Sequence, residues 1–208
     1  MIYDYPDETT PLRQGDIFFP LPWTCLDLSN LLVIDKEGNI RYTSWQEIKE
    51  KDDVVINAPV TASWGIVATQ DCDALRSPMI SLFGIGLLQQ ITKITLPNNP
   101  KKWVSFITQK SRLNARWFYL PPDEKIGFKE RMAINFDIVL QIQRENLERY
   151  TRGLRRGRLK GIAYEHYRES VAQYFRRYPY DEWYPLDKNE FEEYKKEKGD
   201  VKPFDWQI

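Results

Sequence analysis

The sequence contains few of the residues that build disulfide frameworks and metal sites. Its 208 residues include 2 cysteines, Cys25 and Cys72, and a single histidine, His166. One cysteine pair is too little for a disulfide framework, so both residues are expected to be free thiols in a reducing compartment. A structural zinc site needs four ligands, and Glu165 and Glu169 beside His166 are typical of a solvated helix face. We therefore expect no metal and no cofactor.

Net charge and long apolar runs are also absent. Lysine plus arginine equals aspartate plus glutamate at 30 each, so no overall field draws the chain to nucleic acid or to a membrane. No apolar run approaches the roughly 20 residues that span a bilayer. Residues 1–8 are acidic and lack the basic start and apolar centre of a signal peptide. These absences predict a cytoplasmic protein without membrane contact.

The charges are unevenly distributed, which is more informative than their zero sum. Basic residues are densest in residues 149–160, and acids gather at the N-terminus and in residues 181–197. The basic segment predicts either a phosphate-binding stripe or a solvated, mobile connection that pairs with Glu145 and Glu148. A nucleic-acid contact would use the following side chains: Arg149, Arg152, Arg155, Arg156, Arg158 and Lys160.

Short apolar or alternating runs between turn signals predict a β-rich first part. A turn at Gly15-Asp16 leads into the first predicted strand, which Pro20 is expected to end. Gly84 and Gly86 predict a bulge or sharp curvature in a later strand. The predicted strands cover residues 17–19, 31–34, 40–42, 54–56, 64–69, 79–88, 103–108 and 117–120. Such a series is typical of a small closed barrel.

Two further local patterns complete this first part. Residues 35–39 predict a hairpin turn. Ser44 and Glu47 form a capping-box pattern, which predicts reciprocal side-chain-to-backbone bonds at the start of a short helix ending near Lys51.

The apolar periodicity changes after Pro121-Pro122. Apolar residues then recur at helical spacing, which predicts helices over residues 135–150, 164–178 and 187–198. The fold class predicted is therefore α+β. The predicted domains are an extended leader (1–11), a β-barrel domain (12–120) and a helical extension packed on the barrel (121–208).

Polar residues directly follow the central predicted strand. Gln70, Asp71, Cys72 and Asp73 follow residues 64–69 directly. Two interpretations stay open: a small polar site, or a strand-ending turn whose aspartates bind backbone N–H groups. The flanking acids disfavour a thiolate nucleophile, so Cys72 is expected to be buried or half-buried and slow to react. Asp16 likewise either holds a loop by accepting backbone N–H bonds or lines the same groove as Asp71.

Three of these features together resemble the MazF/PemK growth-inhibitor toxins. They are Gln14-Gly15-Asp16-Ile17, the strand ending in Gln70-Asp71, and Ser77-Pro78 before the next strand. The resemblance implies an SH3-like barrel and an RNA-interacting protein of a toxin–antitoxin or phage-defence module, which would cut single-stranded RNA without a metal. The chain also resembles an uncharacterised bacterial family with Gln-Gly-Asp-Ile and Cys-Asp motifs, which implies no activity.

The chain departs from the toxin pattern at two positions. Ser63-Trp64 stands where the toxins have an arginine, and Met79 where they have a hydroxyl residue. RNA cleavage of this kind needs a base and a cation near the developing phosphorane charge. The candidate catalytic residues are the carboxylates and the two arginines that could replace the missing one: Asp16, Asp71, Arg13 and Arg76.

Three functions stay open at this point. The first is RNA interaction, with catalysis undecided. The second is a non-catalytic adaptor that binds a protein partner, such as an antitoxin or defence-system component, through the barrel groove and the aromatic residues Trp183, Trp206 and 178–184. The third is a thiol enzyme built on Cys72, with His166 as the only available imidazole.

Overall fold

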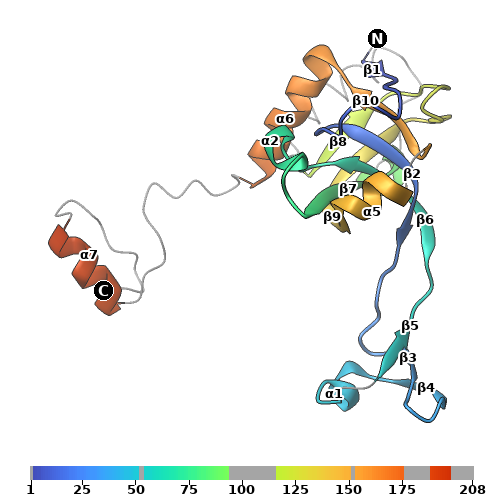
Figure 1. Cartoon of the computed structure of the whole chain (residues 1–208), viewed down its shortest axis with the longest axis vertical. Helices are drawn as coiled ribbons and strands as arrows, with labels where there is room; N and C mark the ends of the chain where they lie inside the picture. Colours follow the sequence, from blue (N-terminus) through green and yellow to red (C-terminus); the bar gives the residue numbers. More distant parts are fainter. Residues whose placement is uncertain (1, 52–53, 94–115, 151–152, 176–187, 198–208) are drawn as a thin grey trace. The chain divides into compact units, whose positions relative to one another are not determined.

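The computed structural model describes residues 2–51, 54–93, 116–150, 153–175 and 188–197. The chain divides into two compact units, residues 1–171 and residues 172–208 (Figure 1). The second unit contains the predicted C-terminal helix, α7 (Lys188–Glu197). No helix in the described ranges is both long enough and apolar enough to cross a membrane.

Most of the first unit is one antiparallel sheet. Its strand order in the described part of the chain is β1-β10-β2-β6-β7-β9-β8. The strands are β1 (Tyr3–Asp4), β2 (Asp16–Trp23), β6 (Thr61–Val67), β7 (Met79–Leu87), β8 (Trp117–Leu120), β9 (Met132–Gln143) and β10 (Arg155–Leu159). The architecture is therefore α+β and rich in antiparallel strands, as predicted.

The centre of this sheet is apolar and closely packed. Ile17 of β2 lies opposite Ile66 of β6, and both are fully buried, which confirms the predicted sharing of one sheet. The register of β7 against β9 shifts between Phe83 and Gly84, which confirms the predicted bulge. A Cβ on Gly84 would lie 2.8 Å from Cγ2 of Ile138, so glycine is what lets β9 approach.

The two edges of the sheet are linked by side chains. Tyr3 of β1 donates a hydrogen bond to the carbonyl of Pro121, just after β8, at 2.9 Å. Tyr5 donates to the carboxylate of Asp123 at 2.8 Å. Among the described residues no backbone ladder joins β1 to β8. The sheet is thus held edge to edge by the segment that follows β8.

Helix α6 (Gly161–Phe175) packs on the sheet through a buried tyrosine. The Tyr167 hydroxyl donates to the carbonyl of Val67 at 3.0 Å. Its ring centroid lies 5.8 Å from that of Phe118 and 6.5 Å from that of Phe136. Burial raises the pKa of Tyr167 well above its usual range. The predicted helix over residues 164–178 is confirmed as far as Phe175.

The chain between β2 and β6, which we call the arm (residues 24–60), forms a second small sheet. Its elements are β3 (Leu31–Ile34), β4 (Ile40–Thr43), α1 (Trp45–Ile48) and β5 (Val55–Asn57), with strand order β4-β3-β5. Leu31, Val33 and Ile48 form its core. Paired residues Trp23 and Thr61 close its base. These strands and the hairpin turn at residues 35–39 were predicted.

Two predicted local details are wrong. Pro20 does not end the first strand, because β2 continues to Trp23. The register shifts between Phe18 and Leu21, which takes Pro20 out of the ladder, so its missing N–H breaks no pairing. The helix α1 forms without a side-chain cap; Ser44 instead donates to the Glu47 carboxylate at 3.2 Å.

The predicted division into leader, barrel and helical extension is also wrong. β1 pairs with β10, so the leader contributes to the sheet. Residues 132–143 form strand β9, and only α5 (Arg144–Tyr150) remains of the helix predicted over residues 135–150. β9 pairs with β7 at residues 132–135 and 139–143 and with β8 at residues 132–135, and this tertiary pairing overrides the apolar spacing.

Some predictions fall outside the described residues. These are the strand at residues 103–108, Arg152, and the C-terminal aromatic residues Trp183, Trp206 and 178–184.

Candidate functional site

Asp16 is the centre of a buried polar cluster. Its side chain is fully buried. Arg158 donates from Nε to Oδ1 at 2.6 Å and from Nη2 to Oδ2 at 2.9 Å. Arg155 donates from Nη1 to Oδ2 at 3.2 Å, and the backbone N–H of Arg13 donates to the same oxygen at 3.1 Å. The predicted loop-holding bond from a backbone N–H is confirmed, and two arginine partners are added to it. We call these four residues the Asp16 cluster.

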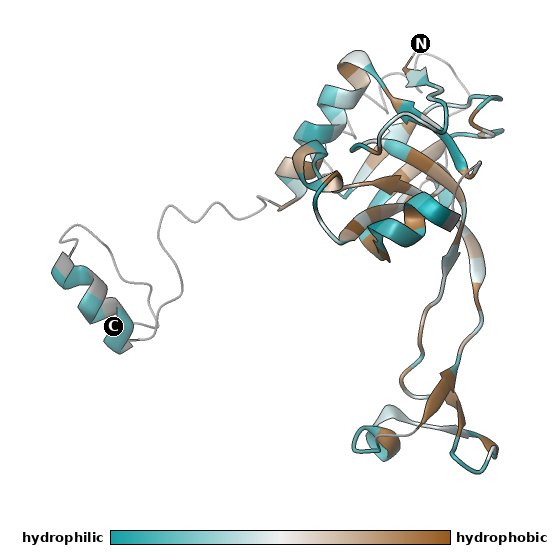
Figure 2. Cartoon of the chain, viewed as in Figure 1, coloured by the Kyte–Doolittle hydropathy of each residue, from teal (hydrophilic) through white to brown (hydrophobic). Residues whose placement is uncertain are grey.

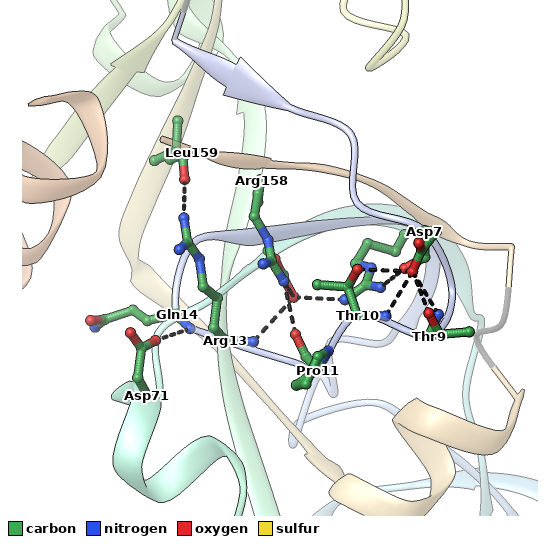
Figure 3. A network of polar contacts seen from close by, with 11 residues as sticks. Asp7, Thr9, Thr10, Pro11, Arg13, Gln14, Asp71, Arg158 and Leu159 are labelled. Atoms are coloured by element: carbon green, nitrogen blue, oxygen red, sulfur yellow. Dashed lines mark hydrogen bonds and ion pairs between the residues drawn. The ribbon is translucent and has the colours of Figure 1, made fainter. Parts of the chain in front are cut away.

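The same arginines hold the segment before β2 against β10. Arg158 donates from Nη2 to the carbonyl of Pro11 at 2.9 Å, and Arg155 donates to the carbonyl of Asp7. Asp7 in turn accepts bonds from Thr9 and Thr10, which lower its pKa to about 2. Figure 3 shows this chain of contacts. It explains why residues 5–15 follow a fixed path instead of forming an extended leader.

Gln14 and Gly15 connect this cluster to the end of β6. The N–H of Gln14 donates to Oδ1 of Asp71 at 2.8 Å, and its side-chain amide donates to the carbonyl of Ala68 at 2.7 Å. Gly15 has a φ of +86°, and a Cβ there would lie 3.3 Å from the Tyr164 ring. Glycine is therefore required both by conformation and by space. The two motifs singled out in the sequence meet at this point.

Asp71 accepts hydrogen bonds both from Gln14, before β2, and from Tyr164 of helix α6. Its Oδ2 accepts a bond of 2.6 Å from the Tyr164 hydroxyl. Burial, and then the hydrogen bond to Asp71 and the charge on that carboxylate, raise the pKa of Tyr164 to about 12. Tyr164 is therefore a protonated donor at neutral pH. Sequence reasoning placed Tyr164 only at the start of a helix, because no local signal marks a partner 93 residues away.

Two arginines lie over the ring of Tyr164. The guanidinium carbon of Arg13 is 4.6 Å from the ring centroid and that of Arg168 is 5.5 Å from it. Arg13 also donates from Nη2 to the carbonyl of Leu159 at 2.8 Å. Arg168 pairs with Glu165 at 3.4 Å, and both of those side chains are more than half exposed. We call Arg13, Asp71, Tyr164 and Arg168 the Tyr164 site.

The turn after β6 is a surface helix, so the prediction that Cys72 is buried or half-buried is wrong. Residues Asp71–Ala74 form the single-turn helix α2, whose buried residue is Ala74. Cys72 and Asp73 are exposed, and Cys25 is exposed on the arm. The physical reason is the change from extended to helical backbone at Asp71, which turns only one side chain of the four inward.

The predicted basic stripe is split by the fold. Arg158 and Arg155 face Asp16, with side chains only 8% and 11% exposed. Arg149 and Arg156 are exposed, and Lys160 is half-buried. Arg156 donates to the carbonyl of Phe19 at 3.1 Å. Residues Arg155–Leu159 form strand β10 rather than a mobile connection, because Arg155 and Arg158 pair with Asp16, which is far away in sequence.

The remaining candidates lie at the surface. Arg76 follows α2 and is exposed, as is His166 on α6. Within the described ranges, no group of three histidine, cysteine, aspartate or glutamate side chains is placed to hold a metal ion.

Arg155 also lines a cleft of about 470 Å³. Leu12, Phe18 and Leu147 line its apolar part, and Glu8 and Glu148 contribute carboxylates. These acids disfavour a phosphate ligand. An anionic polymer is therefore better matched by the Tyr164 site than by this cleft.

The geometry limits what the carboxylates can do. Asp16 is enclosed and accepts four hydrogen bonds, so it is out of reach of a substrate hydroxyl. Both oxygens of Asp71 accept bonds from within the chain, although the residue is at the surface. A general base must be within hydrogen-bond reach of the proton that it removes. The arrangement favours binding over proton transfer.

No family model, curated protein or solved structure matches this chain.

Proposed function

We propose that this protein is a MazF/PemK-like RNA-binding protein that contacts single-stranded RNA at the Tyr164 site without cutting it. The observation that carries the proposal is the position of two guanidinium groups, those of Arg13 and Arg168, over the ring of Tyr164. Tyr164 is only 8% exposed, whereas the Arg168 side chain is 52% exposed. Arginine matches phosphate oxygens with paired N–H donors. The proposal applies equally to a toxin-derived module and to a phage-defence component.

The two arginines suit a phosphate in different ways. Arg13 is held in place by Leu159 and carries five N–H donors, so one bond to a carbonyl leaves donors for a ligand. Arg168 is paired with Glu165 only through an exposed contact of 3.4 Å. Such pairs contribute little to stability, so Arg168 can exchange its partner for a phosphate at small cost.

We propose binding without cleavage because the carboxylates of Asp16 and Asp71 are already engaged in hydrogen bonds within the chain. In this fold Asp16 and Asp71 hold segments together, and each accepts bonds that a catalytic base would have to give up. The toxin resemblance implies cleavage, but Ser63-Trp64 replaces the arginine of that pattern. We therefore assign to these residues a structural role beside the RNA.

A comparison of Arg168→Ala with Arg41→Ala tests the proposal. Both residues are exposed, and both changes remove one positive charge. Fluorescence anisotropy with a labelled single-stranded RNA is measured at several salt concentrations. Arg168→Ala should weaken binding and reduce the salt slope by about one phosphate, whereas Arg41→Ala should leave both unchanged.

Three outcomes contradict this proposal. Wild-type protein that does not bind RNA at low salt removes it and favours the protein adaptor. Equal losses in the two variants show that only net charge matters and that the Tyr164 site is not used. Shortened RNA on a gel after incubation shows that the protein cuts, which contradicts binding alone.

A further inference from the structure

The small sheet of the arm has two unlike faces. On the inner face Leu31 and Val33 pack with Ile48 of α1 and are buried. On the outer face all but one of the cross-strand neighbours are also apolar or aromatic. One row is Ile40, Ile34 and Val55, and the next is Tyr42, Leu32 and Asn57.

The outer face is open to solvent. The exposed fractions of Ile40, Tyr42 and Val55 are 65%, 68% and 64%. Exposed large apolar residues elsewhere on the arm are Leu26, Leu28, Trp45 and Val60. Figure 2 shows strand β3 of the arm in the hydrophobic colour, whereas β4 is mixed. Contiguous apolar patches of this kind, as opposed to scattered residues, mark interaction surfaces.

The charges of the arm indicate what kind of surface it fits. Residues 24–60 contain seven acidic and four basic residues. Residues 1–23 and 61–171, which hold the large sheet, contain 14 acidic and 19 basic residues. The arm and the rest of its own unit therefore have opposite charge. A surface that complements the arm should be apolar and bordered by basic side chains.

The turn from α2 to β7 has these properties. Leu75 and Met79 are exposed apolar residues, 53% and 38% exposed, and the exposed Arg76 lies between them in sequence. The backbone N–H of Arg144 donates to the carbonyl of Pro78 at 2.8 Å, which brings the backbone of a second arginine to the same turn. The Arg144 side chain is 35% exposed and lies 3.6 Å from the carboxylate of Glu148. We call Leu75, Arg76, Met79 and Arg144 the turn patch.

We propose that the outer face of the arm docks on the turn patch of a second copy of this chain. Because each copy carries both surfaces, two copies can exchange arms in a closed dimer with two equivalent contacts. Apolar side chains then leave water on both surfaces, and the acidic arm meets the arginines of the turn patch. This inference goes beyond RNA binding and does not depend on it.

Single substitutions on each surface test the dimer. Ile40→Lys places a positive charge in the arm face, where it would meet Arg76 of the other copy. Arg76→Glu places a negative charge opposite the acidic arm. Each variant should weaken dimerisation at least about tenfold in sedimentation velocity, because unpaired or like charges are costly in an apolar contact. Ile162→Lys is the matched control, since Ile162 is 73% exposed on α6, outside both surfaces; it should dimerise like the wild type.

A mixture of the two variants provides the stricter test. In a mixed dimer, the lysine introduced at position 40 faces the glutamate introduced at position 76, and the second contact is the wild-type one. Mixing Ile40→Lys with Arg76→Glu should therefore give a dimer that is tighter than the dimer of either variant alone. A wild-type protein that stays monomeric at the highest soluble concentration overturns the proposal. So does a mixture that stays monomeric, or a dimer that Ile162→Lys disrupts as strongly as Ile40→Lys.

Discussion

The guanidinium of Arg158 and the carboxylate of Asp16 form a two-bond ion pair, with distances of 2.6 and 2.9 Å, between residues 142 positions apart in the chain. Both side chains are almost completely buried. The pair joins the first residue of β2 to strand β10, and Arg155 and the Arg13 N–H complete the set of donors. Removing one member leaves the charge of the other without compensation.

We expect Asp16→Asn to destabilise the fold by about 3–5 kcal/mol, since it leaves Arg158 buried without a counter-charge. Asp137→Asn is the matched control. Asp137 pairs with Arg116 at 2.7 Å, but these side chains are 36% and 64% exposed, so its loss should cost about 1 kcal/mol or less. Urea denaturation of both variants measures the difference. Equal effects would show that the Asp16 cluster contributes no more than a surface pair.

The burial of Tyr164 and its bond to Asp71 should make stability fall at high pH. The pKa of Tyr164 is raised from 10.0 to about 12 in the folded state. A raised folded-state pKa stabilises the protein below the unfolded pKa, and this stabilisation is lost as pH rises from about 10 to about 12. The free energy of unfolding of Tyr164→Phe should therefore fall less steeply over this range than that of the wild type. Tyr42→Phe, at a 68% exposed position, should follow the wild type; parallel curves for all three proteins would contradict the assignment.

Gly15 and Gly38 have similar backbone conformations but different surroundings, so changing each to alanine distinguishes the cost of backbone strain from the cost of crowding. Gly15 and Gly38 have φ values of +86° and +82°. A Cβ on Gly38 meets nothing within 4 Å, whereas one on Gly15 lies 3.3 Å from Tyr164. Each change to alanine should cost about 1–2 kcal/mol through the left-handed backbone, and Gly15→Ala should cost more because the Tyr164 ring must shift. Thermal unfolding decides this, and a smaller loss for Gly15→Ala than for Gly38→Ala contradicts it.

The exposed position of Cys72 changes what alkylation should show. Both Cys72 and Cys25 are exposed, so brief iodoacetamide treatment of the folded protein should label both. Mass spectrometry of the two peptides gives the rates. Labelling in denaturant provides the fully accessible reference. Protection of Cys72 relative to this reference would contradict the surface position of α2, and selective labelling of Cys72 far faster than Cys25 would favour the thiol-enzyme interpretation.

Local signals were sufficient for much of the fold. The strands around Ile17, Ile66 and Ile80 were predicted because each is a short apolar run between turn residues. The hairpin at residues 35–39 was predicted because glycine and asparagine tolerate the backbone of a tight turn. Helix α6 was predicted because Val171, Tyr174 and Phe175 recur at helical spacing. Of these three only Val171 is buried.

The parts that were missed depend on partners distant in sequence. In β9, Phe136, Val139 and Leu140 satisfy a helical pattern, and it is the long ladder with β7 that makes the segment a strand. In β10, Arg155 and Arg158 indicate a solvated segment until Asp16 is placed beside them. The candidate site was predicted in part, since the Gly15-Asp16 and Gln70-Asp71 motifs do lie together. The hydrogen bond of Tyr164 to Asp71 and the position of Arg168 over the Tyr164 ring could not be predicted from neighbouring residues.

The strand order has a consequence for synthesis on the ribosome. β10 lies between β1 and β2 in the sheet, so the first two large-sheet strands to be made have no common neighbour until residue 159 has left the exit tunnel. β2, β6 and β7 are adjacent and can pair early. Until β10 has been synthesised, Asp16 lacks its partner Arg158 and strand β1 lacks the strand with which it pairs. Insertion of β10 is thus the step that completes the sheet, and it comes late in translation because these contacts span most of the chain.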